Sequence, residues 1–387
     1  YSDTTKVAQA DWLQNGFDDA SAVTLTWTDA APDRTLTLSP TAVSYDYFIQ
    51  GKKYNETGNL TAQLTDTEGL WVIYFDSEGV LATALNPSHA QIDTVIMTKA
   101  VVAYVYWDAT NNDGRLMTEK HGSNMAPATH HWLHDNMGAV YREGMALANF
   151  DIDQDGNTTT DAQFSIAAGE FYDEDIEHDL SAVLSTAGVE IWYLVGTAWR
   201  WITRAGYSFQ MSAGDVYYNN AGAQTAVGNN DFCLGHIFAT NITDDSGANP
   251  KYIAIQGQYE YTTRGDARDG AEVEINELAY GTLPLQEIVP VATFIIQNRG
   301  TYGALRTTES GANFVDWRSS NLKGAGGTVA EHGSLAGLSD DDHAQYALLA
   351  GRATVQTFAD SLNIRTPITE ENAINITGAA FDESSIG

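Results

Sequence analysis

The chain has 387 residues, of which 43% are hydrophobic and 11% aromatic, so it has enough apolar side chains for roughly two or three folded domains. Its 19 basic and 51 acidic residues give a formal net charge of −32, which argues against nucleic acid and anionic membrane surfaces as partners. The single cysteine, Cys233, excludes an intrachain disulfide framework, and we expect a buried thiol there rather than a nucleophile. We find no apolar run long enough to span a bilayer, and therefore expect no membrane insertion.

The first hundred residues favour β-strands. Apolar residues alternate with threonines through Val23–Thr28, which is typical of a half-buried strand. Residues 71–75 (WVIYF) form a continuous apolar run of strand length, which indicates a strand buried on both faces. Residues 95–107 are a second long β-branched and aromatic stretch, also expected to be strand. Strands at this spacing predict a sandwich or a small barrel over residues 1–110.

Residues 111–150 break the β pattern. Ala126-Pro127 is typical of a helix start, and Gly138 is typical of a helix end. We therefore predict a helical connector between two β-domains.

Histidines are concentrated in this connector. His130 and His134 share one face of the predicted helix, and His131 and His121 lie nearby, which would suit a zinc site. However, no glutamate lies between these histidines, and only Asp135 offers a carboxylate at ligand spacing in the sequence. Hydrogen-bonded histidines at an interface are the preferred interpretation.

An acidic segment follows the connector. Carboxylates alternate at Asp151, Asp153 and Asp155, and Gly156 supplies a turn, as in the first half of a calcium-binding loop. The twelfth position of such a loop is Ala162, so the bidentate glutamate is missing. A solvated turn is preferred, with a weak calcium site as the alternative, and no other cofactor is expected.

A second β-domain is predicted over residues 151–317, because long apolar or alternating runs return at residues 191–195, 199–202, 232–238, 253–261 and 289–296. Trp192, Trp199 and Trp201 are candidate sugar contacts, although β-domain cores use the same residues and a core role is preferred. The acidic run at residues 173–179 could hold a glycosidase carboxylate pair, but a solvated loop is preferred.

A short helix is predicted near residues 338–350. Ser339 or Asp340 can cap its start, and Gly351 can end it. A two-turn helix is marginal alone, and its flanks are rich in glycine and alanine, so we expect it to pack against copies of itself around an axis. The residues expected to form this trimeric collar are Leu338, Asp340, Asp341, Asp342, His343, Gln345, Tyr346, Leu349, Gly351 and Arg352.

The collar segment, L-x-G-L-S-D-D-D-H-x-Q-Y followed by L-L-A-G-R over residues 335–352, resembles a segment that recurs in bacteriophage tail fibres and related virion appendages. Ala344 departs from the proline usual in that family. Residues 38–71 and 119–134 also resemble an N-terminal β-domain and a helical connector of phage tail proteins. The resemblance implies a non-enzymatic, homotrimeric virion protein that links the particle to host-receptor-binding parts. Other tail or baseplate proteins, and a host surface glycan, are the implied partners.

The expected organisation is mainly β: a β-domain (1–110), a helical connector (111–150), a second β-domain (151–317), a hinge and helical collar (318–352) and the start of an intertwined trimeric shaft (353–387). Both β-domains are expected to be sandwiches or barrel-like. The sparse polar end leads us to expect further sequence, or a docking protein, beyond Gly387. Two alternative functions stay open: a polysaccharide-degrading tail spike, and a calcium-dependent carbohydrate-binding adhesin.

Overall fold

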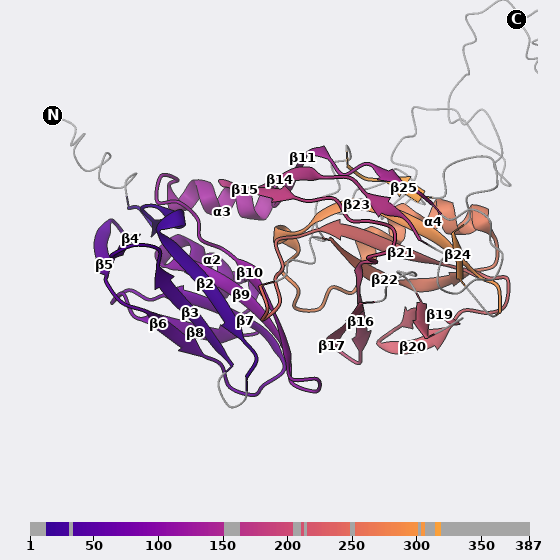
Figure 1. Cartoon of the computed structure of the whole chain (residues 1–387), viewed down its shortest axis with the longest axis horizontal. Helices are drawn as coiled ribbons and strands as arrows, with labels where there is room; N and C mark the ends of the chain where they lie inside the picture. The colour runs from indigo at the N-terminus through magenta and orange to yellow at the C-terminus, as the bar shows by residue number, and fades with distance from the viewer. Residues whose placement is uncertain are drawn as a thin grey trace, which may run out of the picture. The chain divides into compact units, whose positions relative to one another are not determined.

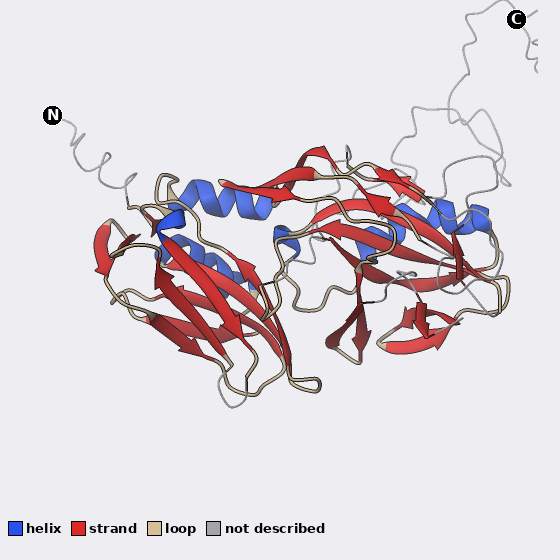
Figure 2. Cartoon of the chain, viewed as in Figure 1, coloured by secondary structure: helices blue, strands red, loops and turns tan. Residues whose placement is uncertain are grey.

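The computed structural model describes residues 13–30, 34–150, 163–203, 210–212, 215–247, 252–300, 303–305 and 314–318, all of which belong to one compact unit ending at Val329. Over these residues the protein is mainly β, as the sequence predicts, and it has three α-helices (Figure 2). Residues 319–352 of the predicted hinge and collar, and the predicted shaft, lie outside the described residues.

The first β region, residues 13–118, contains three sheets (Figure 1). They have the strand orders β1-β4-β5, β2-β3-β6 and β10-β9-β7-β8. The elements are β1 (Gly16–Phe17), β2 (Val23–Thr28), β3 (Thr35–Pro40), β4 (Tyr45–Ile49), β5 (Lys52–Glu56), β6 (Leu60–Gln63), β7 (Gly69–Phe75), β8 (Leu81–Leu85), α2 (His89–Thr98), β9 (Ala100–Asp108) and β10 (Asp113–Thr118).

Aromatic side chains form the core of the first β region. Tyr47 stacks on Phe75 with ring centroids 3.8 Å apart, and Trp27 meets Trp107 edge-on at 6.2 Å. The alternation through β2 places Val23 and Trp27 in this core and leaves the threonines between them at the surface or partly covered. Each large apolar side chain buried here contributes on the order of 1.5–3 kcal/mol to the free energy of folding.

Strand β9 is buried along its whole length because its two faces belong to two different cores. Val105 and Trp107 point into the core of the first β region, whereas Tyr104 and Tyr106 pack against side chains from residues 192–317. Strand β7 is likewise buried on both faces, as the apolar run at residues 71–75 predicts. The first β region therefore shares a core with the second.

The second β region, residues 140–318, is built on a mixed sheet of order β17-β16-β22-β21-β23-β24, with β25 also paired to β23. Strands β16 and β22 are parallel, and β21 pairs antiparallel with both β22 and β23. Cys233 on β21 is buried, which confirms the expected apolar thiol, and burial raises its pKa. The strands are β11 (Val140–Gly144), β12 (Leu147–Ala148), β13 (Ser165–Ile166), β14 (Gly169–Asp173), β15 (Ile176–Leu180), β16 (Glu190–Val195), β17 (Ala198–Thr203), β18 (Gln210–Ser212), β19 (Asp215–Asn220), β20 (Ala223–Ala226), β21 (Phe232–Ala239), β22 (Tyr252–Tyr261), β23 (Val289–Asn298), β24 (Gly303–Leu305) and β25 (Phe314–Asp316).

The helices differ from the sequence-based expectation in two places. Residues 95–98 were expected to be strand, but they end α2, whose start at Ser88 carries a capping box with Gln91. Helix α4 (Arg264–Glu277) was not expected inside a β-domain. Its N-cap Thr263 accepts a hydrogen bond from the Asp266 N–H, and its buried alanines allow close packing on the sheet.

The predicted connector helix is confirmed as α3 (Pro127–Asn136), with proline at its first turn and Gly138 at a φ of +56° after its end. Helix α3 packs against α2, and the Ala139 N–H beyond it donates to the Gln286 carbonyl beside the 3-10 turn η2 (Leu285–Glu287). This packing brings the histidine face of α3 to a hairpin of the second β region.

Candidate functional site

Histidine and carboxylate side chains from four separate segments meet beneath α3, and we call them the joint cluster. Glu119 and His121 follow β10, and His130 and His134 lie one turn apart on α3. Asp173 and Glu174 lie at the β14–β15 turn, and Glu287 ends η2. The joint cluster comprises Glu119, His121, His130, His134, Asp173, Glu174 and Glu287.

These side chains are removed from solvent. Asp173 and Glu287 are 0% exposed, Glu119 is 2% exposed, and the side chain of Glu174 is also fully covered. Carboxylates are rarely found at such burial unless they are paired or bind a metal. Lys120, which lies between two cluster residues in the sequence, turns away and donates to the carbonyls of residues 20 and 23. Among the described residues, no lysine or arginine forms an ion pair with any cluster carboxylate.

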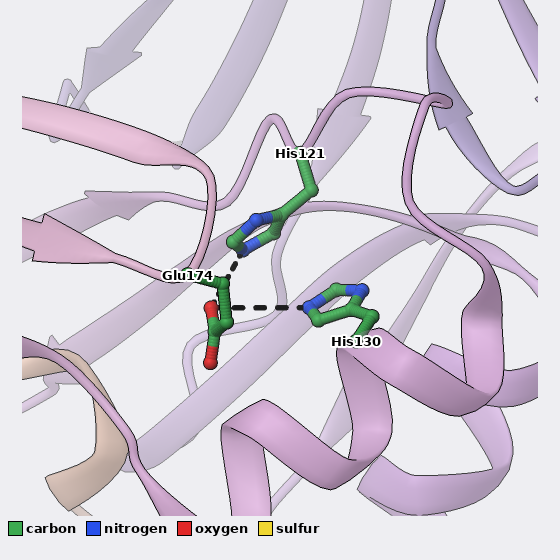
Figure 3. A group of neighbouring side chains, drawn as sticks. All are labelled: His121, His130 and Glu174. Carbon is green, nitrogen blue, oxygen red and sulfur yellow. Dashed lines mark ion pairs between the residues drawn. The ribbon is translucent and has the colours of Figure 1, made fainter.

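The distances between Glu174 or Glu287 oxygens and the histidine nitrogens are longer than those of typical hydrogen bonds. Glu174 Oε2 lies 3.6 Å from His121 Nε2 and 4.0 Å from His130 Nε2 (Figure 3). On its other side, Glu174 Oε1 lies 3.7 Å from His134 Nδ1, which in turn lies 3.4 Å from Glu287 Oε1. These separations exceed the 2.7–3.2 Å range typical of N–H···O hydrogen bonds.

Both oxygens of Asp173, Glu174 and Glu287, and one oxygen of Glu119, have no hydrogen-bond partner in the described part of the chain when these groups are ionised. A buried carboxylate left in this condition destabilises a fold. In the protonated form the carboxyls hydrogen-bond one another, Glu287 with Glu119 and Asp173, and Asp173 with Glu174.

A second buried histidine–glutamate pair of the same chain, His236 and Glu274, lies within hydrogen-bonding distance and has further hydrogen-bond partners. His236 Nδ1 lies 2.8 Å from Thr293 Oγ1, and its Nε2 lies 3.2 Å from Glu274 Oε1. Glu274 also accepts hydrogen bonds from the Gln258 N–H and the Tyr261 hydroxyl. The fold is thus able to satisfy a buried histidine–glutamate pair with donors from the backbone and from tyrosine, whereas Glu174 and Glu287 of the joint cluster accept no hydrogen bond from the backbone or from a basic side chain of the described residues.

The cluster carboxyls favour the protonated form when no cation is present. Burial, followed by repulsion from neighbouring carboxylates, raises the pKa of Glu119, Asp173 and Glu287 well above the ordinary carboxyl range. Burial and the charge of Asp173 raise the pKa of Glu174 to about 9. Any process that ionises these groups must therefore supply a compensating positive charge.

The histidines of α3 favour the neutral form. Burial, followed by repulsion from His121, lowers the pKa of His134 to about 3, and the same causes lower the pKa of His130 well below its usual value. Burial disfavours the charge on His121 as well, but a hydrogen bond to Asp175 and the neighbouring carboxylates outweigh burial and raise its pKa. Neutral imidazoles are the form that binds metal ions.

Asp175 fixes the orientation of His121. Its Oδ1 lies 2.7 Å from His121 Nδ1, and its Oδ2 accepts a hydrogen bond from the Gly122 N–H. With Nδ1 held by Asp175, Nε2 of the ring faces Glu119 and Glu174 at 3.3 and 3.6 Å. A carboxylate on the far nitrogen of a histidine is the usual support of a metal-binding imidazole.

Glu174 occupies a restricted backbone position. Asp173 pairs with Ile176, so Glu174 and Asp175 form a two-residue hairpin turn. Glu174 has a φ of +44°, in the region that favours glycine, asparagine or aspartate at such turns. Strain of this kind is concentrated at functional positions.

The structure brings together residues that the sequence placed in separate hypotheses. In the sequence only Asp135 offered the connector histidines a carboxylate at ligand spacing, but in the structure carboxylates at residues 119, 173, 174 and 287 also lie near them. The run at residues 173–179 was preferred as a solvated acidic loop; that interpretation is wrong for Asp173 and Glu174, which are buried. The proximity of Glu119 to His121 was available in the sequence, whereas no local pattern marks Glu287.

Two of the three candidate tryptophans lie in the core. Trp192 is 0% and Trp199 1% exposed, and the Trp199 Nε1–H donates to the Tyr280 carbonyl inside the core. Trp201 is half-buried, lies 4.8 Å from the Trp192 ring and donates to Asp113. The preferred core interpretation therefore holds for Trp192 and Trp199, whose rings are covered, and the sugar-contact hypothesis stays a prediction for Trp201.

The remaining site predictions lie outside the described residues. These are the calcium candidate at Asp151, Asp153 and Asp155 and the collar at residues 338–352.

No family model, no curated protein and no solved structure matches this chain. Among the described helices, none is long and apolar enough to cross a membrane.

Proposed function

We propose that this chain is a non-enzymatic structural component of a bacteriophage tail fibre or related virion appendage, where it links the particle to host-receptor-binding parts. The observation that carries the proposal is the segment L-x-G-L-S-D-D-D-H-x-Q-Y…L-L-A-G-R at residues 335–352. It is a long, nearly unbroken match to a segment of such appendages. Other tail or baseplate proteins would be its neighbours in the virion.

The proposal includes a homotrimer. Sandwich- or barrel-like β-domains precede a helical collar, and residues 353–387 begin an intertwined trimeric shaft. The apolar residues of the collar helix and the thin, polar shaft segment need partner copies to cover them, since neither can bury a core alone.

A mechanical role agrees with the contacts between the two β regions. Arg200 Nη1 donates to Glu68 at 2.8 Å, and the Trp199 N–H donates to the Tyr106 hydroxyl at 2.9 Å. Together with the shared core, these bonds favour a stiff link that transmits force. The burial of the joint cluster also favours a non-catalytic role, because a polymeric substrate has no direct access to carboxylates that are 0–2% exposed.

Two alternatives make different predictions. A polysaccharide-degrading spike would release sugar fragments from host surface glycan, and a calcium-dependent adhesin would be retained on that glycan only while calcium is present. We expect neither turnover nor calcium-dependent retention with the purified chain. Either positive result would replace the structural proposal with the corresponding alternative.

A further inference from the structure

The joint cluster has the composition and spacing of a metal centre. We propose that it binds a first-row transition-metal dication such as zinc through His121 Nε2, His130 Nε2 and Glu174 Oε2. We further infer that His134 and Glu287 form a second ligand set on the other oxygen of Glu174. The inference stands independently of the proposed virion role.

The distances between the proposed ligand atoms are close to those of shared coordination. Two ligands bound about 2.0–2.1 Å from one tetrahedral ion lie roughly 3.3–3.4 Å apart. In the first set, Glu174 Oε2 lies 3.6 Å from His121 Nε2 and 4.0 Å from His130 Nε2, so a shift of a few tenths of an ångström would bring these atoms to that spacing. In the second set, His134 Nδ1 lies 3.4 Å from Glu287 Oε1 and 3.7 Å from Glu174 Oε1. Atoms at these separations are too far apart for good hydrogen bonds and close enough to share an ion.

The negative charge of the ionised carboxylates also favours a bound cation. Glu119, Asp173, Glu174 and Glu287 carry four negative charges when ionised, and no described lysine or arginine pairs with them. One dication balances two of these charges, and two dications balance all four. The unpartnered oxygens would then become ligands or neighbours of a cation instead of unsatisfied buried acceptors.

The donor types select the class of ion. Calcium and magnesium prefer oxygen ligands, whereas neutral imidazole suits zinc, iron, nickel and related ions. The cluster offers imidazole nitrogens together with carboxylates, so calcium is the less suitable ion. Asp175, on the far nitrogen of His121, supplies the orienting carboxylate that such sites usually have.

The position of the cluster has a consequence for stability. A surface pocket of about 520 Å³ lies near it, because its lining includes Gly122, next to His121 in the chain, and Asp175, which contacts His121. The proposed ligands come from the segment after β10, from α3, from the β14–β15 turn and from η2. An ion held by all of them would tie the connector helix to both β regions and stabilise the native state.

A surface set of ligands on α2 and α3 competes with this assignment. His131 Nε2 lies 3.4 Å from Asp93 and 3.2 Å from Asp135, and His89 Nε2 lies 3.7 Å from each of these carboxylates. This set is exposed, with the His89 side chain 61% accessible. The double variant His89→Ala/His131→Ala removes its two imidazoles and leaves the joint cluster intact, so it is the matched control.

The test is calorimetric titration of Zn²⁺ into the tag-free full chain after chelator treatment. We expect saturable binding in the wild type and in the His89→Ala/His131→Ala control, with dissociation constants within about twofold of each other. Asp175→Asn should weaken binding about 10–100-fold, as loss of an outer-sphere carboxylate typically does, and Glu174→Gln should weaken it by more than about 100-fold. Glu174→Gln keeps the size and shape of the side chain and removes its ability to carry a negative charge. The metal-free fold, checked by circular dichroism, should be retained.

A second readout separates a metal centre from a cluster that only holds protons. Zinc binding should release protons, seen as a binding enthalpy that changes with the ionisation enthalpy of the buffer, and should raise the melting temperature of the wild type. No zinc-induced rise in melting temperature would overturn the proposal. Binding that survives Glu174→Gln but is lost in the His89→Ala/His131→Ala control would assign the ion to the surface set and also overturn it.

Discussion

Arg115 on β10 and Glu190 on β16 form a buried ion pair across the boundary between the two β regions, with Nη2 2.8 Å from Oε2 and Nε 3.1 Å from the same oxygen. The two residues are 75 positions apart in the chain, and they are 8% and 6% exposed. The pair is therefore a direct polar link between segments that the sequence analysis assigned to the connector and to the second β-domain.

Removing one partner of this pair should destabilise the protein. Glu190→Gln leaves the Arg115 guanidinium buried with only Asp113 as its carboxylate partner. Breaking a buried pair in this way costs about 3–5 kcal/mol of the free energy of unfolding, and the remaining Asp113 contact should keep the loss near the lower end. Urea unfolding monitored by tryptophan fluorescence measures it.

The matched control is Arg142→Gln. Arg142 pairs with Glu170 and Glu177 at the surface, where solvent screens the charges, so its loss should change the free energy of unfolding far less. If Glu190→Gln and Arg142→Gln lowered the free energy of unfolding equally, the Arg115–Glu190 pair would not stabilise the link between the two β regions.

The metal-free chain should lose stability as the pH rises from about 5 to 8. Glu174 has a raised pKa of about 9 in the fold, above its unfolded value near 4.5, so the folded state holds a proton that the unfolded state releases. Stability is thus fully present below the unfolded pKa and falls until the pH passes the folded pKa. In Glu174→Gln the free energy of unfolding should fall less steeply with pH. Urea unfolding at several pH values, in buffer that contains chelator, measures this. A steeper or unchanged decline would show that Glu174 is not the titrating group.

The buried tryptophans should matter for stability and not for glycan binding. Trp199→Ala should reduce the free energy of unfolding by about 3–5 kcal/mol, because it leaves a cavity and removes the hydrogen bond to Tyr280. Trp132 on α3 is 56% exposed, and Trp132→Ala should change stability by no more than about 0.5 kcal/mol. Chemical denaturation measures both free energies of unfolding. Similar decreases for Trp199→Ala and Trp132→Ala would contradict the core position of Trp199.

The proposed collar should respond to charge at Tyr346. Tyr346→Asp would place three carboxylates near one axis and should shift the purified chain from trimer toward monomer in size-exclusion chromatography with light scattering. Tyr346→Phe keeps the ring and should leave the trimer unchanged. A wild-type chain that runs as a clean monomer under native conditions would refute the trimer.

Local patterns in the sequence were sufficient for much of the β structure. Alternation at Val23–Thr28 and the apolar run at residues 71–75 predicted strands correctly, since side-chain periodicity directly reflects which faces are buried. Pro127 and Gly138 likewise marked the limits of α3. The failure at residues 95–98 has a physical reason: β-branched residues suit both strands and buried helix faces, and the Ser88 capping box decided in favour of the helix.

The joint cluster could not be assembled from local patterns. Its members span residues 119–287, and Glu287 has no neighbouring histidine or carboxylate in the chain to mark it. The acidic run at residues 173–179 resembles a solvated loop in sequence, but the β14–β15 hairpin turns Asp173 and Glu174 inward and leaves Glu177 exposed. Burial of a short charged segment depends on the tertiary fold that surrounds it.

If the chain is part of a phage tail appendage, as we propose, it must be found on the tail of intact virions. Particles produced by the phage that encodes this chain would be labelled with an antibody raised against residues 13–318 and imaged by electron microscopy. We expect label on a tail fibre or another projecting appendage of intact particles. Particles that carry no label, while the antibody detects the chain free in the same lysate, would contradict the proposed role in the tail.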